Sequence, residues 1–289
     1  MKPLILVKNE ESTASNHSQI NCKPFLKWAG GKSQLWDEIS RRIPTDFSTY
    51  FEPFLGGGSI FFYLQPKQAY LSDVNFELIN TYRVIRDNVD ELITDLKTHI
   101  HQEEYFYQIR NIDRAEAYQN WNAIKRASRL IYLNKTCYNG LTRVNSKGQF
   151  NVPFGKYANP KIVDENNLIA CHQALKNAEI NVGSFREIEQ LVTSEDFVYF
   201  DPPYAPLSET ANFTSYTQDG FGEEQHRELK ELCDRLTEKR VRWLLSNSSA
   251  PWILELYQDY KIEFVQANRA INSKSEKRGK VEEILVSNY

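Results

Sequence analysis

Short apolar runs alternate with helical patterns along this 289-residue chain, from Phe25 to the C-terminus. This alternation is typical of an α/β fold, in which helices pack on a central sheet. The sequence therefore predicts an α/β protein with seven strands. We expect the strands at Thr49–Phe54, Ala69–Ser72, Glu179–Val182, Phe197–Phe200, Val241–Ser246, Ile262–Gln266 and Glu283–Ser287.

The alternation stops between the second and third predicted strands. Apolar residues recur there at three- and four-residue steps from Ile79 to Ile100, which predicts one amphipathic helix. A second helix is predicted at Trp121–Leu133, and Tyr138–Tyr157 predicts a loop and hairpin. A further helix at Glu223–Arg240 would pack on the sheet.

These patterns divide the chain into three parts. Residues 1–22 are polar and aperiodic after Val7, and they predict a flexible N-terminal tail. Residues 23–75 and 162–289 would form the sheet domain, and residues 76–161 a mostly helical insert.

The charges of the chain are segregated. The net charge is −3, yet no acidic residue occurs between Glu116 and Asp164. The stretch carries eight basic residues, and without them the rest of the chain has a net charge of −11. A basic segment of this kind favours a nucleic-acid partner. The eight residues are Lys125, Arg126, Arg129, Lys135, Arg143, Lys147, Lys156 and Lys161.

Composition argues against several other classes of protein. No apolar run approaches the ~18 residues of a membrane span, and Leu4–Val7 is shorter than the ~7-residue minimum of a signal-peptide core. We therefore expect a cytoplasmic protein. The four cysteines form no Cys-x-x-Cys pair, which disfavours a zinc ribbon or a disulfide framework. His99 and His101 lack further ligands at suitable spacing, so we predict a solvated helix surface there and no metal.

A glycine-rich loop, Gly56-Gly57-Gly58, follows the first predicted strand. Glycines let the backbone approach a ligand closely at a strand end, where open α/β sheets bind nucleotide-like groups. Asp73 ends the next strand, 17 residues after Gly56, and can accept hydrogen bonds from ribose hydroxyls. Together the two features predict a cofactor that contains adenosine.

A second glycine cluster, Gly30-Gly31-Lys32-Ser33, resembles the end of a phosphate-binding loop. That motif requires a glycine at position 26, where this chain has Leu26, and no convincing strand precedes the cluster. A nucleoside triphosphatase is therefore disfavoured. We predict instead that Lys32 lies against a carboxylate and that Trp28 lies against an adenine or methionine moiety.

The catalytic strip, Asp201-Pro202-Pro203-Tyr204, follows the buried strand Phe197–Phe200 and should lie at the same sheet edge as the glycine loop. Its two prolines hold the backbone extended. The strip offers a carboxylate, carbonyl oxygens and an aromatic face.

That set suits methylation of an exocyclic amine, whose lone pair is conjugated into the base. Asp201 and the carbonyl of Pro202 can each accept one amine hydrogen, and Tyr204 can stack on the base. A cytosine-C5 enzyme would instead need a cysteine nucleophile, usually after proline, and no cysteine here follows proline. The strip alone does not distinguish adenine from cytosine, or DNA from RNA.

Five blocks in this order resemble the Dam family of DNA adenine-N6 methyltransferases. They are Phe25–Lys32, Phe51–Gly58, Leu71–Asn75, Asp201–Tyr204 and Arg278–Glu283. The resemblance covers about residues 24–289. It implies a mixed seven-stranded methyltransferase sheet, S-adenosylmethionine as cofactor, and a target adenine flipped from duplex DNA, in GATC.

The resemblance also implies which residues hold the cofactor. One departure concerns Ser184, because the family usually places an acidic residue before the phenylalanine that is Phe185 here. Ser184 can form hydrogen bonds but brings no charge, so we expect a different cofactor affinity. The cofactor-binding residues expected here are Trp28, Lys32, Phe54, Gly56, Gly58, Asp73, Ser184, Phe185 and Asp201.

By the same resemblance, the insert carries most of the residues that read DNA. Arg143 has the bidentate fork suited to guanine O6 and N7, and it would read an outer base pair with Leu141 and Pro153. The other expected contacts are Lys27 and Tyr157 on the first G·C pair, Tyr138 and Asn139 inside the duplex, and Lys135 and Lys156 on phosphate.

Two alternatives stay open at the level of the sequence. One is an enzyme of the same fold that acts on cytosine N4 or on RNA adenine, although the DNA-type insert disfavours RNA. The other is a catalytically silent DNA-binding protein, which predicts a broken strip or cofactor loop, and neither is broken here. No obligatory protein partner is predicted.

Overall fold

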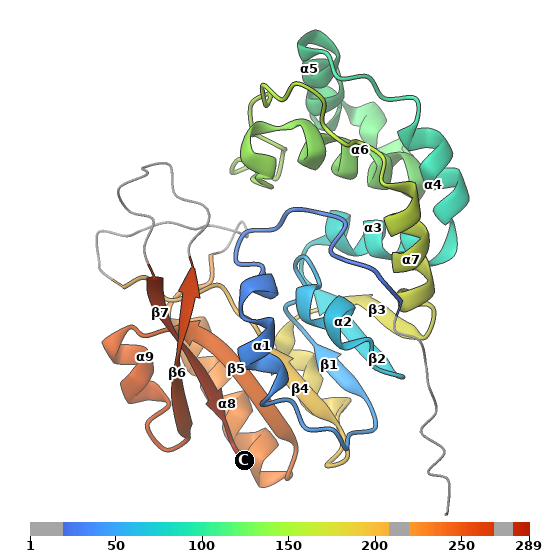
Figure 1. The fold of residues 1–289 in the computed structure, drawn as a ribbon. Coiled ribbons are helices and arrows are strands. Elements are labelled where there is room, and N and C mark those ends of the chain that lie inside the picture. The colour runs from blue at the N-terminus through green and yellow to red at the C-terminus, as the bar shows by residue number, and fades with distance from the viewer. Residues whose placement is uncertain (1–19, 208–219, 269–279) are drawn as a thin grey trace, which may run out of the picture.

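The computed structural model describes residues 20–207, 220–268 and 280–289. These residues contain a seven-stranded sheet with the order β3-β2-β1-β4-β5-β7-β6 (Figure 1). Strands β3, β2, β1, β4 and β5 are parallel to one another, whereas β7 runs antiparallel to both of its neighbours, β5 and β6. The predicted mixed α/β sheet is therefore confirmed. No helix within the described ranges is long and apolar enough to cross a membrane.

All seven predicted strands are present; β4 has the predicted bounds, and the ends of the other six are shifted. The largest extension is in β6 and β7, which pair with each other from Lys261 opposite Ser287 to Asn268 opposite Lys280. Residues 1–19 of the predicted tail and Arg278 of the last block lie outside the described residues. The strands are β1 Tyr50–Glu52, β2 Ala69–Asp73, β3 Ala178–Val182, β4 Phe197–Phe200, β5 Arg242–Ser248, β6 Lys261–Asn268 and β7 Lys280–Ser287.

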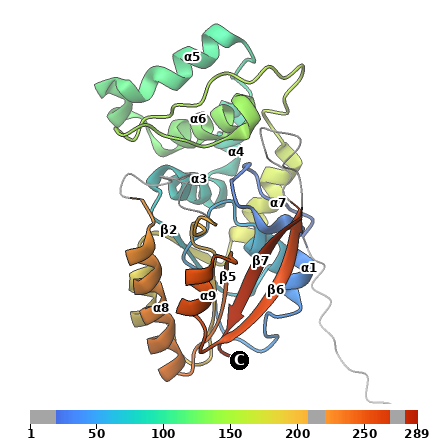
Figure 2. The same cartoon turned by 90° about the vertical axis from the view of Figure 1, so that its left-hand side faces the viewer.

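Alternate residues of the central strands point to opposite faces of the sheet, and each face has its own hydrophobic core. Phe197 and Tyr199 of β4 pack with one set of helices, whereas Val198 and Phe200 pack with the other set. The two sets of helices lie on opposite faces of the sheet (Figures 1 and 2). The first set is α1 Trp36–Ser40, α2 Ser59–Leu64, α3 Phe76–Asp87 and α7 Glu165–Leu175. The second set is α8 Glu223–Glu238 and α9 Pro251–Leu256.

The single helix predicted from Ile79 to Ile100 is wrong. The chain forms α3 and then α4, Val89–Leu96, with a break at Asn88. Asn88 has φ −142° and ψ 44°, which is not helical. The apolar stripe crosses the break because both helices bury their apolar sides in the same core. Periodicity alone therefore did not reveal two helices.

The rest of the insert contains two α-helices, a hairpin and the short 3-10 helices η2 Ile112–Arg114, η3 Glu116–Asn120 and η4 Tyr138–Gly140. The α-helices are α5, Glu103–Asn111, and α6, Ala123–Thr136, which begins after an N-cap in which Asn122 accepts the Lys125 N–H. Antiparallel bridges join Cys137 to Phe154 and Val144 to Phe150, so the predicted hairpin is present. The insert has a small core of its own around α5, α6 and the hairpin, while α3, α4 and one side of α6 belong to the sheet core. The domain bounds stay a prediction.

The predicted solvated surface at His99 and His101 is also wrong. Both residues follow the end of α4. The His99 ring stacks on Tyr132 at 4.4 Å and is largely buried, which lowers the pKa of His99. His101 Nε2 lies 3.0 Å from the carbonyl oxygen of Tyr157. The two histidines thus connect the end of α4 to α6 and to the hairpin.

Candidate active site

Three strands end side by side where the sequence predicted the site. The parallel strands β2, β1 and β4 are neighbours in the sheet, so their carboxyl ends lie at one edge. Asp73 ends β2, the glycine loop follows β1, and the catalytic strip follows β4. The fold therefore brings the predicted cofactor residues and catalytic residues together.

The glycine loop orients the carboxylate of Asp73. Asp73 Oδ2 accepts the Gly56 N–H at 3.0 Å, and Oδ1 accepts the Asn75 N–H at 2.9 Å. Burial raises the pKa of Asp73. Gly56 has φ +47°, and a Cβ at this position would lie 2.8 Å from Trp28 Cδ1. Only glycine fits there, because the indole of Trp28 packs directly on the loop.

Lys32 lies against the carboxylate of the catalytic strip. Lys32 Nζ is 2.8 Å from Asp201 Oδ1 and 2.6 Å from the carbonyl oxygen of Gly30, and Lys32 is only 6% exposed. The same ammonium lies 4.4 Å from the ring centroid of Tyr204. The predicted carboxylate neighbour of Lys32 is thus Asp201. The same ammonium group contacts both Asp201 and the ring of Tyr204, the first and last residues of the strip.

Two residues that the sequence did not single out complete the support of the strip. Ser246 Oγ of β5 donates to Asp201 Oδ1 at 2.7 Å. Tyr204 Oη donates to Glu283 Oε2 of β7 at 2.8 Å. The only sequence signal for Ser246 is its place among polar residues at the end of an otherwise apolar strand.

Glu52 is a buried carboxyl group at the end of β1, and sequence reasoning missed its role. It is 2% exposed, and Tyr50 Oη donates to its Oε2 at 2.9 Å. The pKa of Glu52 is raised to about 8, because burial and the negative charge of Asp201 raise it more than the contacts with Tyr50 and Lys32 lower it. Glu52 is therefore mainly protonated at neutral pH, which avoids a second negative charge beside Asp201.

Aromatic rings line the adjoining part of the sheet edge. The rings of Phe54 and Phe185 stack at 5.4 Å, and Phe221 meets Phe54 edge-on at 5.6 Å. Ser184 begins the short helix η5, Phe185–Gln190, and its N–H donates to Glu187 Oε1 at 3.1 Å. A carboxylate is therefore present next to Ser184, although Ser184 has none.

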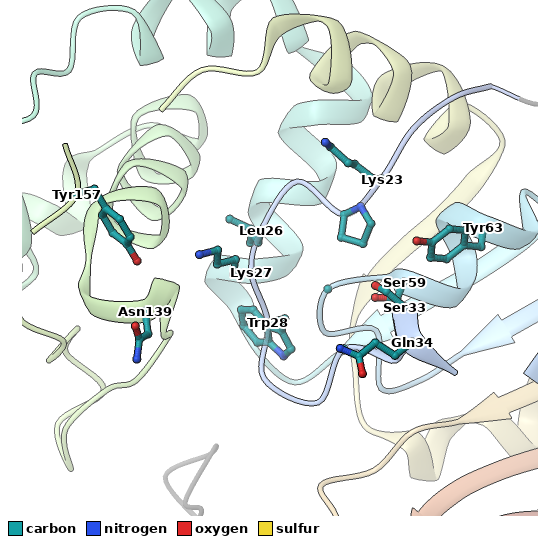
Figure 3. Close-up of a pocket in the computed structure, with 13 residues that line it drawn as sticks. Lys23, Leu26, Lys27, Trp28, Ser33, Gln34, Ser59, Tyr63, Asn139 and Tyr157 are labelled. Atoms are coloured by element: carbon teal, nitrogen blue, oxygen red, sulfur yellow. The ribbon is translucent and has the colours of Figure 1, made fainter. Parts of the chain in front are cut away.

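The predicted DNA-reading residues lie around the junction of the insert and the sheet domain. A cavity of about 650 Å³ is lined by Lys27 and Trp28 together with Asn139 and Tyr157 (Figure 3). The ammonium of Lys27 lies 5.7 Å from the ring centroid of Tyr157. The structure thus brings together Lys27 and Tyr157, which the sequence assigned to the same base pair.

The other predicted readers lie mainly on the exposed side of the hairpin. Tyr138 is 51% exposed, and its N–H donates to the carbonyl of Pro153 at 2.9 Å. Arg143 is exposed and donates to the carbonyl of Asn151 at 3.2 Å. Asn139, Pro153 and Lys156 are exposed, Leu141 is partly buried, and burial lowers the pKa of Lys135.

Asn134 of α6 connects the two groups of readers and was also missed. Its side chain accepts the Lys27 N–H at 2.9 Å and donates to the Lys27 carbonyl at 2.8 Å and to the Gly140 carbonyl at 3.0 Å. Asn134 is fully buried. Its four side-chain contacts, the last to Thr142, fix the segment around Lys27 relative to the loop after Tyr138.

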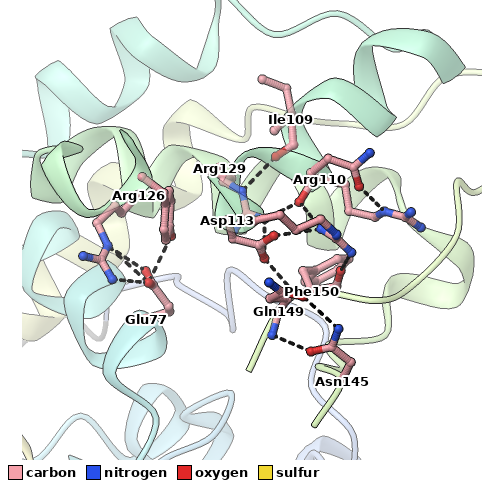
Figure 4. Close-up of polar contacts among 12 residues, drawn as sticks. Glu77, Ile109, Arg110, Asp113, Arg126, Arg129, Asn145, Gln149 and Phe150 are labelled. Atoms are coloured by element: carbon pink, nitrogen blue, oxygen red, sulfur yellow. Dashed lines mark hydrogen bonds and ion pairs between the residues drawn. The ribbon is translucent and has the colours of Figure 1, made fainter. Parts of the chain in front are cut away.

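Two of the eight basic residues in the acid-free segment serve the fold. Arg126 pairs with Glu77 of α3, and Arg129 pairs with Asp113 at 2.8 Å (Figure 4). Arg129 and Asp113 are both buried, and Asp113 Oδ2 also accepts the Phe150 N–H at 2.7 Å. Both acidic partners lie outside the acid-free segment. The positive surface is therefore smaller than the sequence count suggests.

The chain is similar to known proteins over most of its length. Residues 28–271 match the family model of the D12 class N6 adenine-specific DNA methyltransferases. The chain is 45% identical to the type II methyltransferase M1.LlaDCHI of Lactococcus lactis subsp. cremoris, over 94% of this chain and 97% of that protein. It is 40% identical to the type II methyltransferase M.MjaIII of Methanocaldococcus jannaschii, over 93% of this chain and 100% of that protein. It is 37% identical to the DNA adenine methylase of Escherichia coli K12, over 91% of this chain and 94% of that protein.

Proposed function

This chain belongs to the D12 class of N6 adenine-specific DNA methyltransferases, and we propose that it uses S-adenosylmethionine to methylate a flipped adenine in GATC. The observation that carries the proposal is the arrangement at the sheet edge. Asp201 is held by Lys32 and Ser246, directly beside the glycine loop and Asp73. This geometry suits transfer of a group from an adenosine-containing donor to an amine held by the catalytic strip.

The residues at the edge fit S-adenosylmethionine. A carboxylate has about four lone-pair sites, so Asp73 can still accept ribose hydroxyls after its two backbone contacts. Phe54 and Phe185 offer aromatic faces for the adenine, and Glu187 places a carboxylate beside Ser184 in place of the missing acidic residue. When bound, the cofactor supplies an electrophilic methyl group on a sulfonium sulfur. Gly56 and Gly58 let the backbone come close, and Trp28 supports the loop.

The strip would hold the target amine at three points. Asp201 accepts one N6 hydrogen, and the Pro202 carbonyl accepts the other. One face of the Tyr204 ring is occupied by Lys32, and the opposite face stacks on the flipped base. Lys32 and Ser246 orient Asp201 before the base arrives, so little reorganisation remains when the methyl group moves. After the methyl group has moved, the amine carries a positive charge, and one N6 proton leaves through its hydrogen bond to Asp201.

The insert would select the sequence. Exposed Arg143 reads guanine at an outer pair with Leu141 and Pro153, and Lys27 and Tyr157 read the pair on the other side. Tyr138 and Asn139 fill the space that the flipped adenine leaves. Lys135 and Lys156 contact phosphate. This proposal includes no metal and no obligatory protein partner.

The test is to sequence modified bases in DNA from cells that lack adenine methylation and express this chain. We expect N6-methyladenine in GATC sites and none elsewhere, and no methylation with Asp201→Asn as control. N6-methyladenine in another sequence would refute GATC but not the reaction. N4-methylcytosine, or no modified DNA at all, would refute the reaction itself.

A further inference from the structure

Strand β5 ends in three consecutive polar residues that bond to the catalytic strip and to the residue after it. We name Ser246-Asn247-Ser248 the β5 polar run. All three residues are buried, with exposed fractions of 0%, 0% and 4%. A run of buried polar groups at the end of an apolar strand is costly unless each group has a partner.

Side chains of the β5 polar run form hydrogen bonds beyond the point where backbone pairing between β4 and β5 ends. The last paired residues of β4 and β5 are Phe200 and Leu245. Beyond that pair, Pro202 and Pro203 have no N–H to donate, so the ladder does not continue through the strip. Asn247 Oδ1 accepts the Ala205 N–H at 3.1 Å, and Ser248 Oγ donates to the Ala205 carbonyl at 2.7 Å. Two side chains thus replace the missing strand partners.

His226 of α8 supports the same stretch. Its Nδ1 lies 3.5 Å from Asn247 Nδ2, the side chain that holds Ala205. The rings of Phe221 and Trp252 meet the His226 ring edge-on at 4.8 Å and 5.3 Å. Burial lowers the pKa of His226 to about 4, so the ring is neutral at physiological pH. Asn247, which holds Ala205, is therefore itself packed against a neutral ring.

Asp201 and Ala205 are held by different side chains. Asp201 is fixed by Lys32 and Ser246, whose contacts do not involve Ala205. Ala205 is held instead by Asn247 and Ser248, and Tyr204 also contacts Lys32 and Glu283. Loss of the second support should shift the Pro202 carbonyl and the Tyr204 ring while Asp201 keeps its place.

We propose that Asn247 and Ser248 are positioning residues for methyl transfer, which hold Ala205 and thereby aim the Pro202 carbonyl and the Tyr204 ring at the target amine. The proposal rests on the catalytic role proposed above for the strip. Because a misplacement of ~1 Å costs about 10²-fold in rate, Asn247 and Ser248 should affect the chemical step rather than binding.

The experiment is single-turnover methylation of a GATC duplex by excess enzyme at saturating S-adenosylmethionine. Asn247→Leu and Ser248→Ala should lower the rate constant by about 10- to 100-fold. The amplitude, which reports the active fraction, should stay near that of the unmodified protein, as should the Kd for DNA. Ser248→Thr keeps the hydroxyl and should restore the rate. Ser287→Ala is the matched control, since this buried β7 serine bonds to the Tyr289 carbonyl instead.

An unchanged rate constant with a reduced amplitude would overturn the proposal, because it would assign Asn247 and Ser248 to stability alone. Equal rates for Ser248→Ala and Ser248→Thr would also overturn it. If Asn247→Leu does not fold, the two Ser248 variants still decide. Retained activity in Asp201→Asn would instead refute the proposed role of the strip, which separates the two failures.

Discussion

The catalytic strip and the hairpin loop at Tyr138–Tyr157 use polar groups in opposite ways. In the strip, Asp201 and Tyr204 are already bonded to other side chains of the protein. In the loop, Arg143 is exposed and is held only through Asn151 among the contacts described. The strip is organised before the substrate arrives, whereas the loop keeps polar groups available to a partner. Substitutions in the two regions should therefore fail in different ways.

The largest effect is expected at Asp201. Asp201→Asn keeps a hydrogen-bonding group next to Lys32 and Ser246 but removes the charge, and methyl transfer should fall by about 10³-fold. Asp201→Ala should in addition lower the free energy of unfolding by about 3 to 5 kcal/mol, because it leaves the buried ammonium of Lys32 unpaired. Single-turnover rates and chemical denaturation measure the two losses separately.

A double substitution separates chemistry from stability at this position. Lys32→Met with Asp201→Ala removes both charges, so it should recover much of the stability lost in Asp201→Ala and none of the activity. A double variant no more stable than Asp201→Ala would show that the ion pair is not the source of the loss.

Arg129 tests whether a basic residue of the insert stabilises the fold instead of contacting DNA. It is buried against Asp113 and also donates to the carbonyls of Ile109 and Arg110. Arg129→Ala should lower the free energy of unfolding by about 1 to 3 kcal/mol, since the carbonyls of Ile109 and Arg110 lose a donor and Asp113 keeps only Arg114 as a cationic partner. Exposed Lys147→Ala on the hairpin is the control and should change stability little. A stable Arg129→Ala variant with weakened DNA binding would make Arg129 a DNA contact instead.

The sheet could be predicted from the sequence because each strand is a short apolar run that local pattern reveals. The break at Asn88 could not, since α3 and α4 bury their apolar sides in the same core and the stripe continues through it. The histidines after α4 were misplaced for the same reason, as the pattern seemed to extend the helix to them.

The candidate site was predictable only where its chemistry is local. Asp73, the glycine loop and the strip follow strands, so their meeting at one edge follows from parallel topology. The partners Ser246 and Glu283 lie 45 and 79 residues from the groups they hold, and only the packed fold brings them there. The positive surface of the acid-free segment was overestimated for the same reason, because the acidic residues that pair with Arg126 and Arg129 lie outside that segment.

Glu52 gives the strip region a dependence on pH that the loop lacks. Its folded pKa of about 8 lies above the ordinary value of 4.5, so the folded state binds the proton more tightly. The stabilising contribution is complete below pH 4.5 and is lost as the pH rises through about 8. Glu52→Gln should therefore gain stability relative to the unmodified protein by about 1.4 kcal/mol per pH unit in this window.

Chemical denaturation of both proteins at several pH values measures this difference. The pKa of Asp73 is also raised by burial, but Asp73 contributes equally to the stability of both proteins, so its effect cancels in the difference. A difference that stays constant with pH would mean that Glu52 is ionised in the folded protein.

Substitution of Arg143 should change base recognition and leave stability nearly unchanged. Arg143→Ala should leave the unfolding free energy nearly unchanged, because the side chain is exposed, and should relax discrimination at one outer base pair by about 1 to 3 kcal/mol. Methylation rates on duplexes that differ at each position of the site measure this. A uniform loss across all sequences would make Arg143 a phosphate contact.

The smallest effect compares two exposed lysines of the acid-free segment, Lys156 and Lys125. Lys125 lines a surface hollow with the acidic side chains of Asp90, Glu91 and Asp95, whose negative charges disfavour a phosphate there. Lys156 lies in the hairpin, and as a phosphate contact it releases counterions when DNA binds. Lys156→Ala should reduce the slope of log K against log salt by about 0.9, whereas Lys125→Ala should leave the slope unchanged. Equal slopes for the two variants would show that the run of basic residues in the sequence, and not the hairpin surface, determines the attraction to DNA.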